Sequence, residues 1–373
     1  MIYLDNAATT PLDSSAGDIF LKYSKEYFFN ASAIYNEGAK AKKDLEQAKS
    51  TLLKFMGATF NDNLIFTGSA TEANNLAING SYRKNFGTMI FSIGEHPSVY
   101  NTALELQKKG VDVKFVNLQP NGEVDYSHLE SLLNDKISFI SIMHVSNETG
   151  AINDLKKIYE LKTKYCPKAI FHSDGVQAFG KIKINLEYFG VDLYTISGHK
   201  AFAPKGIGAL YVLNKNILNP IIYGGGQEYN LRSGTENIAG IKAFEVATLN
   251  IGDIKQNYSH VQECVKTFLQ ELNGLDYKNN SYFSPYVLSL SFKGVNGETL
   301  VHMMENQNIL ISRGSACSSK KAGNRILENI GLSNAEILGS IRISFSKNST
   351  IDEAKIAGCA LKQCYSQLIK NLY

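Results

Sequence analysis

Seven short apolar runs constrain the fold of this 373-residue chain more than any other feature of its sequence. Continuous apolar runs of this length are typical of strands that are buried on both faces of a sheet. Most gaps between the runs have room for a crossover helix, most clearly at 71–84, 98–108 and 155–165. The alternation predicts an α/β fold with a mainly parallel seven-stranded sheet and helices on both faces. The runs cover residues 64–67, 89–93, 112–116, 137–143, 169–172, 192–196 and 207–212.

The last of these strands, at 207–212, should depart from the parallel pattern. Only residues 197–206 separate it from the preceding run, and this connection is too short for a helical crossover between parallel strands. We therefore expect the seventh strand to run antiparallel to its neighbours.

The sequence pattern changes after about residue 250. An amphipathic helical pattern at 254–272 is followed by a segment at 286–291 that alternates between apolar and polar residues, as a half-buried strand does. Further helical patterns at 298–306 and 351–372 lie on either side of a strand-like segment at 341–345. This order predicts a second, smaller α+β layer.

An acid and a lysine follow two neighbouring predicted strands. Asp174 closes the run at 169–172, and Lys200, in the sequence Ser-Gly-His-Lys, follows the run at 192–196. Open α/β sheets bind ligands at the carboxyl ends of their strands. A lysine there can bind pyridoxal phosphate covalently, and an aspartate can keep the pyridine nitrogen protonated. The alternative is a surface lysine and a helix-capping aspartate.

Other predicted strands also end in polar groups. A Gly-Ser-Ala-Thr-Glu turn at 68–72 leads into a helix expected to begin near Ala70, and a helix start can hold a phosphate, although the same residues also suit ordinary capping. His96 and Asn147 follow the runs at 89–93 and 137–143. A single loop histidine is usually only solvated, but polar groups at four strand ends favour one shared site.

Three motifs carry a resemblance to a known family. They are Tyr-Leu-Asp-Asn-Ala-Ala-Thr-Thr at 3–10, Arg-Ser-Gly-Thr-Glu-Asn at 232–237 and Gly-Ser-Ala-Cys-Ser-Ser at 314–319. With Ser-Ile-Arg-Ile-Ser at 340–344, they make the chain resemble, over nearly its whole length, the NifS/IscS-like cysteine desulfurases of the class V aminotransferase family. The resemblance implies the fold type I of pyridoxal-phosphate-dependent transferases. It also implies a large domain at 15–250 and a small domain, made of 1–14 and 251–373, that carries the cysteine loop.

The resemblance also implies a role for each site residue. Lys200 would carry the cofactor, Asp174 would pair with the pyridine nitrogen, and His96 would stack on the ring. Cys317 would be the nucleophile that accepts sulfur. The remaining contacts would be Gln177 to the phenolic oxygen, Ala70, Thr71, Ser197 and His199 to the phosphate, Thr235 to the phosphate of a partner subunit, and Asn147 with Arg342 to the substrate carboxylate.

The activity implied is conversion of L-cysteine to L-alanine, with the sulfur transferred to Cys317 as a persulfide. A homodimer would pass this sulfur to an acceptor protein, for iron–sulfur cluster assembly or tRNA thiolation. Three alternatives stay open: a selenocysteine lyase, an ordinary transaminase or lyase in which Cys317 is dispensable, and a non-catalytic sulfur-assembly subunit.

Two of these residues also have plain structural interpretations. Cys317 could be a buried structural cysteine, which is common, but its glycine and serine neighbours favour an exposed loop, and nearby Arg313, Lys320 and Lys321 favour the thiolate. Arg342 could belong to a surface ion pair, although its bidentate guanidinium suits a carboxylate ligand.

Composition excludes some classes of function. Lys and Arg total 38 against 35 acids, and a net charge of +3 gives no electrostatic reason to expect nucleic-acid binding. No apolar run approaches membrane-spanning length, and no signal peptide is apparent at the start. Five cysteines, an odd and sparse set, favour a reducing cytoplasm over a disulfide framework. Cys359 and Cys364, five residues apart, suggest no metal pair.

Overall fold

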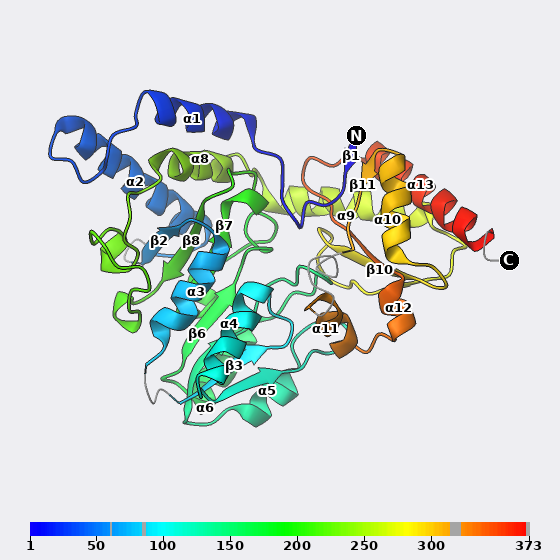
Figure 1. The fold of residues 1–373 in the computed structure, drawn as a ribbon, viewed down its shortest axis with the longest axis horizontal. Coiled ribbons are helices and arrows are strands. Elements are labelled where there is room, and N and C mark those ends of the chain that lie inside the picture. Colours follow the sequence, from blue (N-terminus) through cyan, green and yellow to red (C-terminus); the bar gives the residue numbers. More distant parts are fainter. Residues whose placement is uncertain (60–61, 84–86, 314–321, 371–373) are drawn as a thin grey trace.

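The computed structural model describes residues 1–59, 62–83, 87–313 and 322–370. Its central element is a seven-stranded sheet with the order β2-β8-β7-β6-β5-β3-β4 (Figure 1). Strands β4, β3, β5, β6 and β7 run parallel to one another, whereas β8 is antiparallel to both β7 and β2. The mainly parallel sheet and its antiparallel seventh strand are both confirmed. The strands are β2 (Asn63–Thr67), β3 (Thr88–Ser92), β4 (Val113–Val116), β5 (Ile137–Ser141), β6 (Ile170–Asp174), β7 (Leu193–Ser197) and β8 (Gly208–Val212).

Helices cover both faces of this sheet, because successive strand residues enter different cores. On β2, Ile65 belongs to the hydrophobic core that includes residues of α3 and α4, whereas its neighbours Leu64 and Phe66 belong to the core that includes residues of α2, α6 and α8. This alternation follows from the period of two along a strand. The helices of this part are α1 (Ser14–Lys25), α2 (Asn36–Phe55), α3 (Ala70–Ser81), α4 (Pro97–Lys108), α5 (Tyr126–Leu132), α6 (Leu155–Tyr165), α7 (Leu186–Phe189) and α8 (Ile238–Leu249).

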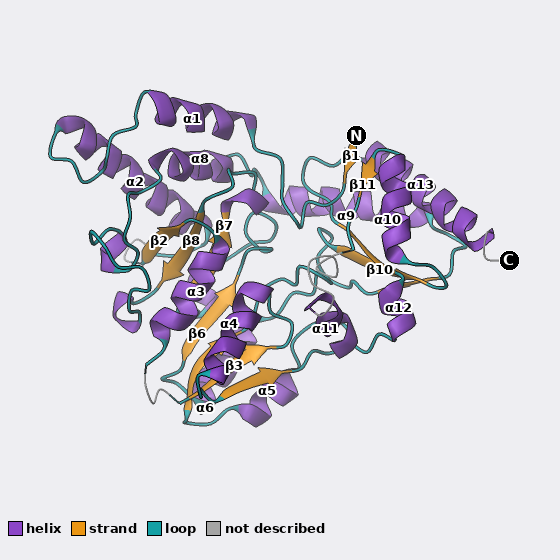
Figure 2. Ribbon diagram, in the orientation of Figure 1, coloured by secondary structure: helices purple, strands orange, loops and turns teal. Residues whose placement is uncertain are grey.

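A smaller α+β layer lies beside the large sheet, and both chain ends lie on its side of the molecule (Figures 1 and 2). Its antiparallel sheet has the order β12-β10-β9, and β1 (Ile2–Tyr3) pairs in parallel with β11 (Ile309–Leu310). Leu4 belongs to the hydrophobic core of this layer. The other elements are α9 (Ile254–Glu271), β9 (Tyr277–Asn279), β10 (Leu288–Phe292), α10 (Gly297–Asn306), α11 (Ala322–Asn329), α12 (Asn334–Leu338), β12 (Ser340–Ile343) and α13 (Ile351–Lys370). The domain limits expected from the sequence, 15–250 against 1–14 with 251–373, stay a prediction.

Some predicted element ends are wrong by a few residues. The strand expected at 137–143 ends at Ser141, although the N–H groups of Ile142 and His144 still donate to the carbonyl oxygens of His172 and Asp174 on β6. The helix with room at 71–84 begins at Ala70, as expected, but it already ends at Ser81. None of the helices in the described part of the chain is long and apolar enough to cross a membrane.

Candidate functional site

A cavity of about 260 Å³ lies at the carboxyl ends of the large sheet's strands. Each residue predicted to bind the cofactor lines it, with the exception of Thr235. A larger groove of about 490 Å³ runs along α9, but it contains neither Lys200 nor Asp174. The smaller cavity is therefore the candidate site. Its lining residues are Ala8, Ser69, Ala70, Thr71, His96, Ser98, Met143, Asn147, Asp174, Val176, Gln177, Ser197, His199 and Lys200.

The start of α3 forms one wall of this cavity. The Ser69 side chain caps the helix by accepting a hydrogen bond from the Glu72 N–H at 3.2 Å. The first N–H groups of a helix lack acceptors within the helix, so those of Ala70 and Thr71 are suited to an anion. Gly208 on β8 lies so close to this turn that a Cβ there would be 2.6 Å from the Ser69 carbonyl carbon. Glycine at this position lets the strand pack against the turn.

Asp174 is the last residue of β6, and it is buried. One carboxylate oxygen accepts from the Val176 N–H at 3.0 Å, and the other accepts from the Asn74 amide at 2.8 Å. Both donors are neutral, and the ion pairs between described residues do not include Asp174. A carboxylate held in this way can pair with a cation in the cavity, such as a protonated ring nitrogen.

Lys200 ends a 3₁₀ turn, Gly198–Lys200, that follows β7. Its ammonium donates to the carbonyl oxygen of Ala7 at 2.6 Å. Burial and the nearby Arg342 guanidinium lower the pKa of Lys200 to about 8. This lower pKa increases the share of Lys200 that is a neutral amine near physiological pH, and the neutral amine is the nucleophilic form.

His96 caps α4, and its Nδ1 accepts from the Ser98 N–H at 3.2 Å. Burial lowers the pKa of His96; the Asp174 carboxylate opposes this shift, and the cationic side chains of Lys200 and Arg325 add to it. The imidazole is therefore neutral at physiological pH. A neutral flat ring in this wall suits contact with an aromatic ring bound in the cavity.

Buried polar atoms without partners point to a ligand. Ser197 is 1% exposed, and its hydroxyl has no hydrogen-bond partner among the described residues. The side-chain oxygen of buried Asn147 likewise lacks one within the described part of the chain. Buried polar groups are nearly always hydrogen-bonded, so these two, both lining the cavity, fit a polar ligand there. His199 adds an imidazole whose pKa burial lowers to about 4, with Lys200 and Lys205 acting in the same direction.

Arg342, on β12, brings the small layer to the edge of the site. Its guanidinium donates to the Asn147 carbonyl oxygen and to Asp5, each at 2.9 Å. A Glu148 carboxylate oxygen lies 3.5 Å away. The structure thus brings Arg342 and Asn147 together as expected. A substrate carboxylate would share the guanidinium with Asp5 and Glu148, which the sequence analysis did not anticipate.

Two predicted residues are not in this cavity. Thr235 lines a separate cavity of about 80 Å³ with Gly68, Glu228 and Arg232. The expectation that Thr235 serves a partner's site stays a prediction. Cys317 lies outside the described residues.

The sequence analysis missed several residues around the cavity. Asn74, which holds Asp174, lies four residues after Ala70 and thus on the same face of α3, a spacing that could have revealed it. On α11, Arg325 places its guanidinium 3.5 Å from the centre of the Tyr100 ring and donates to the Glu95 carbonyl oxygen. Nothing in the local sequence pattern indicated these contacts of Arg325.

Gly175, which follows Asp174, has no room for a side chain. A Cβ on Gly175 would lie 2.0 Å from the Tyr194 ring, whose hydroxyl is 2.7 Å from Nδ1 of His144. Gly175→Ala should therefore lower the free energy of unfolding by about 3 kcal/mol, the cost of overpacking a core. Urea denaturation measures this. Gly17→Ala, in α1, is the matched control and should not destabilise, because its nearest neighbour is the flexible Leu12 side chain; equal effects at both sites would contradict the packing account.

Comparison with protein families gives a match over most of the chain. The model of the class V aminotransferase family matches residues 2–356. A NifS/IcsS protein homolog of Lactobacillus delbrueckii subsp. bulgaricus is 35% identical over 381 residues, covering 99% of this chain and 98% of that protein. Cysteine desulfurase IscS of Rickettsia typhi is also 35% identical, covering 95% of this chain and 89% of its own.

Solved structures give the same result. A NifS-like protein superimposes with a TM-score of 0.91 at 29% identity, covering 99% of both chains. The NifS-like protein of Rickettsia africae superimposes with a TM-score of 0.88 at 31% identity, covering 98% of this chain and 99% of its own. The fold is therefore fold type I, as the resemblance implied. The chain belongs to the class V aminotransferase family and, within it, to the NifS/IscS-like cysteine desulfurases.

Proposed function

We propose that this protein is a pyridoxal-phosphate-dependent cysteine desulfurase that converts L-cysteine to L-alanine and takes the sulfur onto Cys317 as a persulfide. The observation that carries the proposal is the cavity that brings Lys200 and Asp174 together in a chain of the desulfurase family. Neither residue alone would support it, because lysines and aspartates at strand ends are common.

The residues around the cavity fit pyridoxal phosphate. The start of α3 and the unpartnered Ser197 hydroxyl suit its phosphate, with His199 beside them. Asp174 suits the ring nitrogen, His96 the ring face and Gln177 the phenolic oxygen. The cofactor, once bound there, would withdraw electrons from the substrate Cα and make its proton removable.

The side chains around the substrate have separate roles in binding and in proton transfer. Arg342 and Asn147 orient the amino acid by its carboxylate, since the guanidinium offers several N–H donors. Lys200 removes the Cα proton and later returns one, which its pKa of about 8 permits near neutral pH. Arg342 and Asn147 are buried and Lys200 is half-buried, which limits the access of bulk water to these groups.

Cys317 completes the reaction at the substrate sulfur. A new S–S bond forms between the Cys317 thiolate and this sulfur while the substrate C–S bond breaks, and protonation of the carbon gives alanine. The cysteines that the structure describes are less suited than Cys317 to accept the sulfur. Burial raises the pKa of Cys166 to about 11 and also raises the pKa of Cys264 and Cys364. A hydrogen bond to Glu271 raises the pKa of Cys359. Raised pKa values leave little thiolate near neutral pH.

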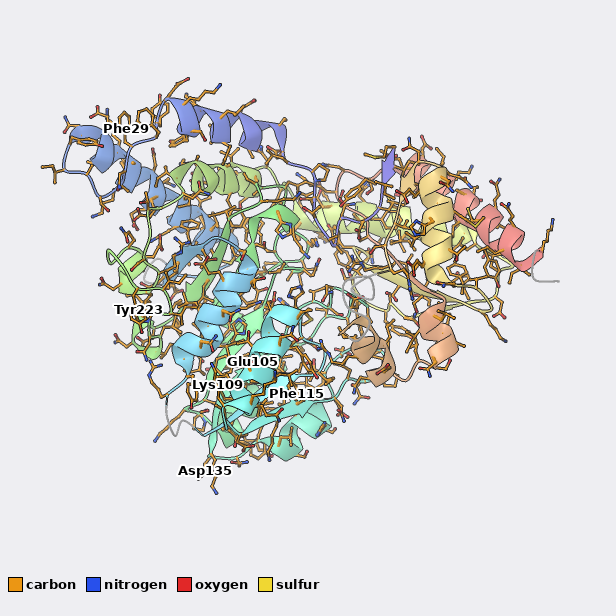
Figure 3. The ribbon with its side chains drawn as sticks, viewed as in Figure 1. Phe29, Glu105, Lys109, Phe115, Asp135 and Tyr223 are labelled. Carbon is orange, nitrogen blue, oxygen red and sulfur yellow. The ribbon has the colours of Figure 1, made fainter. Side chains whose placement is uncertain are left out.

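We also propose a homodimer in which Thr235 reaches the partner's phosphate site. Apolar side chains are exposed at the α1–α2 connection and in the segment before Thr235, and exposed apolar surface of this kind often marks an interface. Figure 3 shows two residues of these segments, Phe29 and Tyr223, on the side of the molecule away from the small layer. The exposed side chains are Tyr27, Phe28, Ile34, Tyr35 and Tyr223. In the cytoplasm, the dimer would pass sulfur to an acceptor protein for iron–sulfur cluster assembly or tRNA thiolation.

Parallel incubations with L-cysteine and L-selenocysteine test the proposed activity. The cofactor-loaded protein should form alanine from L-cysteine together with a protein-bound persulfide. Turnover of selenocysteine alone would make the protein a selenocysteine lyase. Absence of any turnover in a protein that binds the cofactor would favour a non-catalytic sulfur-assembly subunit.

A further inference from the structure

Lys181 is a buried lysine to which the proposed reaction gives no role. Lys181 is 6% exposed, and none of the ion pairs between described residues includes it. Burial, together with the cations Lys200 and Arg342, lowers the pKa of Lys181 to about 7. Burying a cationic group without a counter-charge is unfavourable. A lysine at this position therefore costs stability, which points to a role in function.

The contacts of Lys181 lead directly to the candidate site. Its Nζ donates to Oε1 of Gln177 at 2.5 Å. Nε2 of Gln177 donates in turn to the Ala7 carbonyl oxygen at 2.9 Å. The same carbonyl oxygen accepts from Nζ of Lys200 at 2.6 Å. Lys181 and Lys200 are therefore the two ends of one hydrogen-bonded chain.

These contacts fix the orientation of the Gln177 amide. Turning the amide over would place its oxygen against the Ala7 carbonyl oxygen, a repulsive contact, and its NH₂ group against the Lys181 Nζ, which has no lone pair to accept with when it is an ammonium. A glutamine NH₂ group has two hydrogens, and Ala7 takes one of them. The second hydrogen is left for an acceptor in the cavity, which Gln177 lines.

We propose that Lys181 is a positioning residue of the site: it holds the Gln177 amide so that one N–H donates to an acceptor oxygen in the cavity. This inference rests on the proposed function, because the acceptor would be the phenolic oxygen of pyridoxal phosphate. Lys181 is also connected to Lys200, through Gln177 and the Ala7 carbonyl that Gln177 and Lys200 share. Loss of the Lys181 side chain therefore changes the surroundings of both Gln177 and Lys200.

Lys181→Met, with Lys183→Met as the matched control, tests the inference. Methionine keeps the length of the side chain but cannot donate, and Lys183 is exposed. Equilibrium dialysis of the apoprotein against pyridoxal phosphate should show about 10- to 100-fold weaker binding for Lys181→Met, the range expected for losing a hydrogen bond to a charged group. The visible absorbance spectrum of the bound cofactor should shift as well. Lys183→Met should match the parent in both measurements.

Gln177→Met separates positioning from a purely structural role. It should reproduce the weak binding and the shifted spectrum with Lys181 in place, and adding Lys181→Met to it should weaken binding no further, because Lys181 acts through Gln177. If Lys181→Met does not fold, Lys181→Arg replaces it and should keep the parent spectrum, since a guanidinium can still donate to Oε1.

Three results would overturn the inference. The first is a Lys181→Met protein that keeps the parent's affinity and spectrum and differs only in a lower melting temperature. The second is a Gln177→Met protein with the parent's spectrum. The third is a folded Lys181→Arg protein whose spectrum differs from that of the parent. A parent protein that binds no pyridoxal phosphate would instead overturn the proposed function, and this inference with it.

Discussion

Replacing Lys200 with alanine should lower the rate of alanine formation from L-cysteine by a factor on the order of 10⁴, the upper range for loss of a general acid–base group. Lys200 is the lysine that lines the cavity with Asp174, and its lowered pKa supplies the neutral amine that the proposed reaction needs. The assay is alanine release at saturating substrate. Lys205→Ala, at an exposed lysine in the same loop, should keep parent activity.

Chemical labelling gives this prediction a second readout. Borohydride reduction of the cofactor-loaded parent should attach the pyridoxyl group to Lys200. The competitor is Lys181, the other lysine of the same hydrogen-bonded chain. Attachment to Lys181, or activity of Lys200→Ala within tenfold of the parent, would contradict the assignment of Lys200.

Cys317→Ser should bind L-cysteine and exchange its Cα proton with solvent, yet form alanine at least about 100-fold more slowly, equivalent to roughly 2.7 kcal/mol of barrier. Serine stays protonated near neutral pH and forms no stable sulfur adduct, whereas a thiolate is available there. Exchange is measured by NMR in deuterated water, and alanine by amino-acid analysis.

The other cysteines are the matched controls for Cys317. Alanine at each of Cys166, Cys264, Cys359 and Cys364 should leave desulfuration largely intact, because their raised pKa values keep them protonated. Release of sulfide and alanine by Cys317→Ser at the parent rate would replace the persulfide mechanism with that of a plain lyase.

The sequence revealed the large sheet because its strands are buried on both faces and therefore appear as continuous apolar runs. The spatial order β2-β8-β7-β6-β5-β3-β4 could not be obtained in the same way, since it depends on contacts between distant segments. Helix α8 was also missed. It is apolar around most of its circumference, with Ile241 and Phe244 buried, and such a helix lacks the amphipathic periodicity that identifies one from sequence.

For the site, the position of residues at strand ends was informative, because parallel strands end at one edge of the sheet. This placed Asp174, Lys200 and His96 around one cavity. The contacts that hold these residues in place could not be predicted from the local sequence pattern. Asn74 meets Asp174 across 100 residues of sequence, and Arg342 meets Asp5 across 337. Such pairs follow from the packing of whole elements, which a single sequence does not display.

The most direct test of the account is a single turnover with one equivalent of L-cysteine per cofactor-loaded site. Alanine is quantified in the quenched mixture, and the persulfide is alkylated and located by peptide mass spectrometry. The account predicts one alanine for each persulfide, with the added sulfur on the peptide that contains Cys317. Alanine accompanied only by free sulfide, or sulfur located on Cys166, Cys264, Cys359 or Cys364, would contradict it.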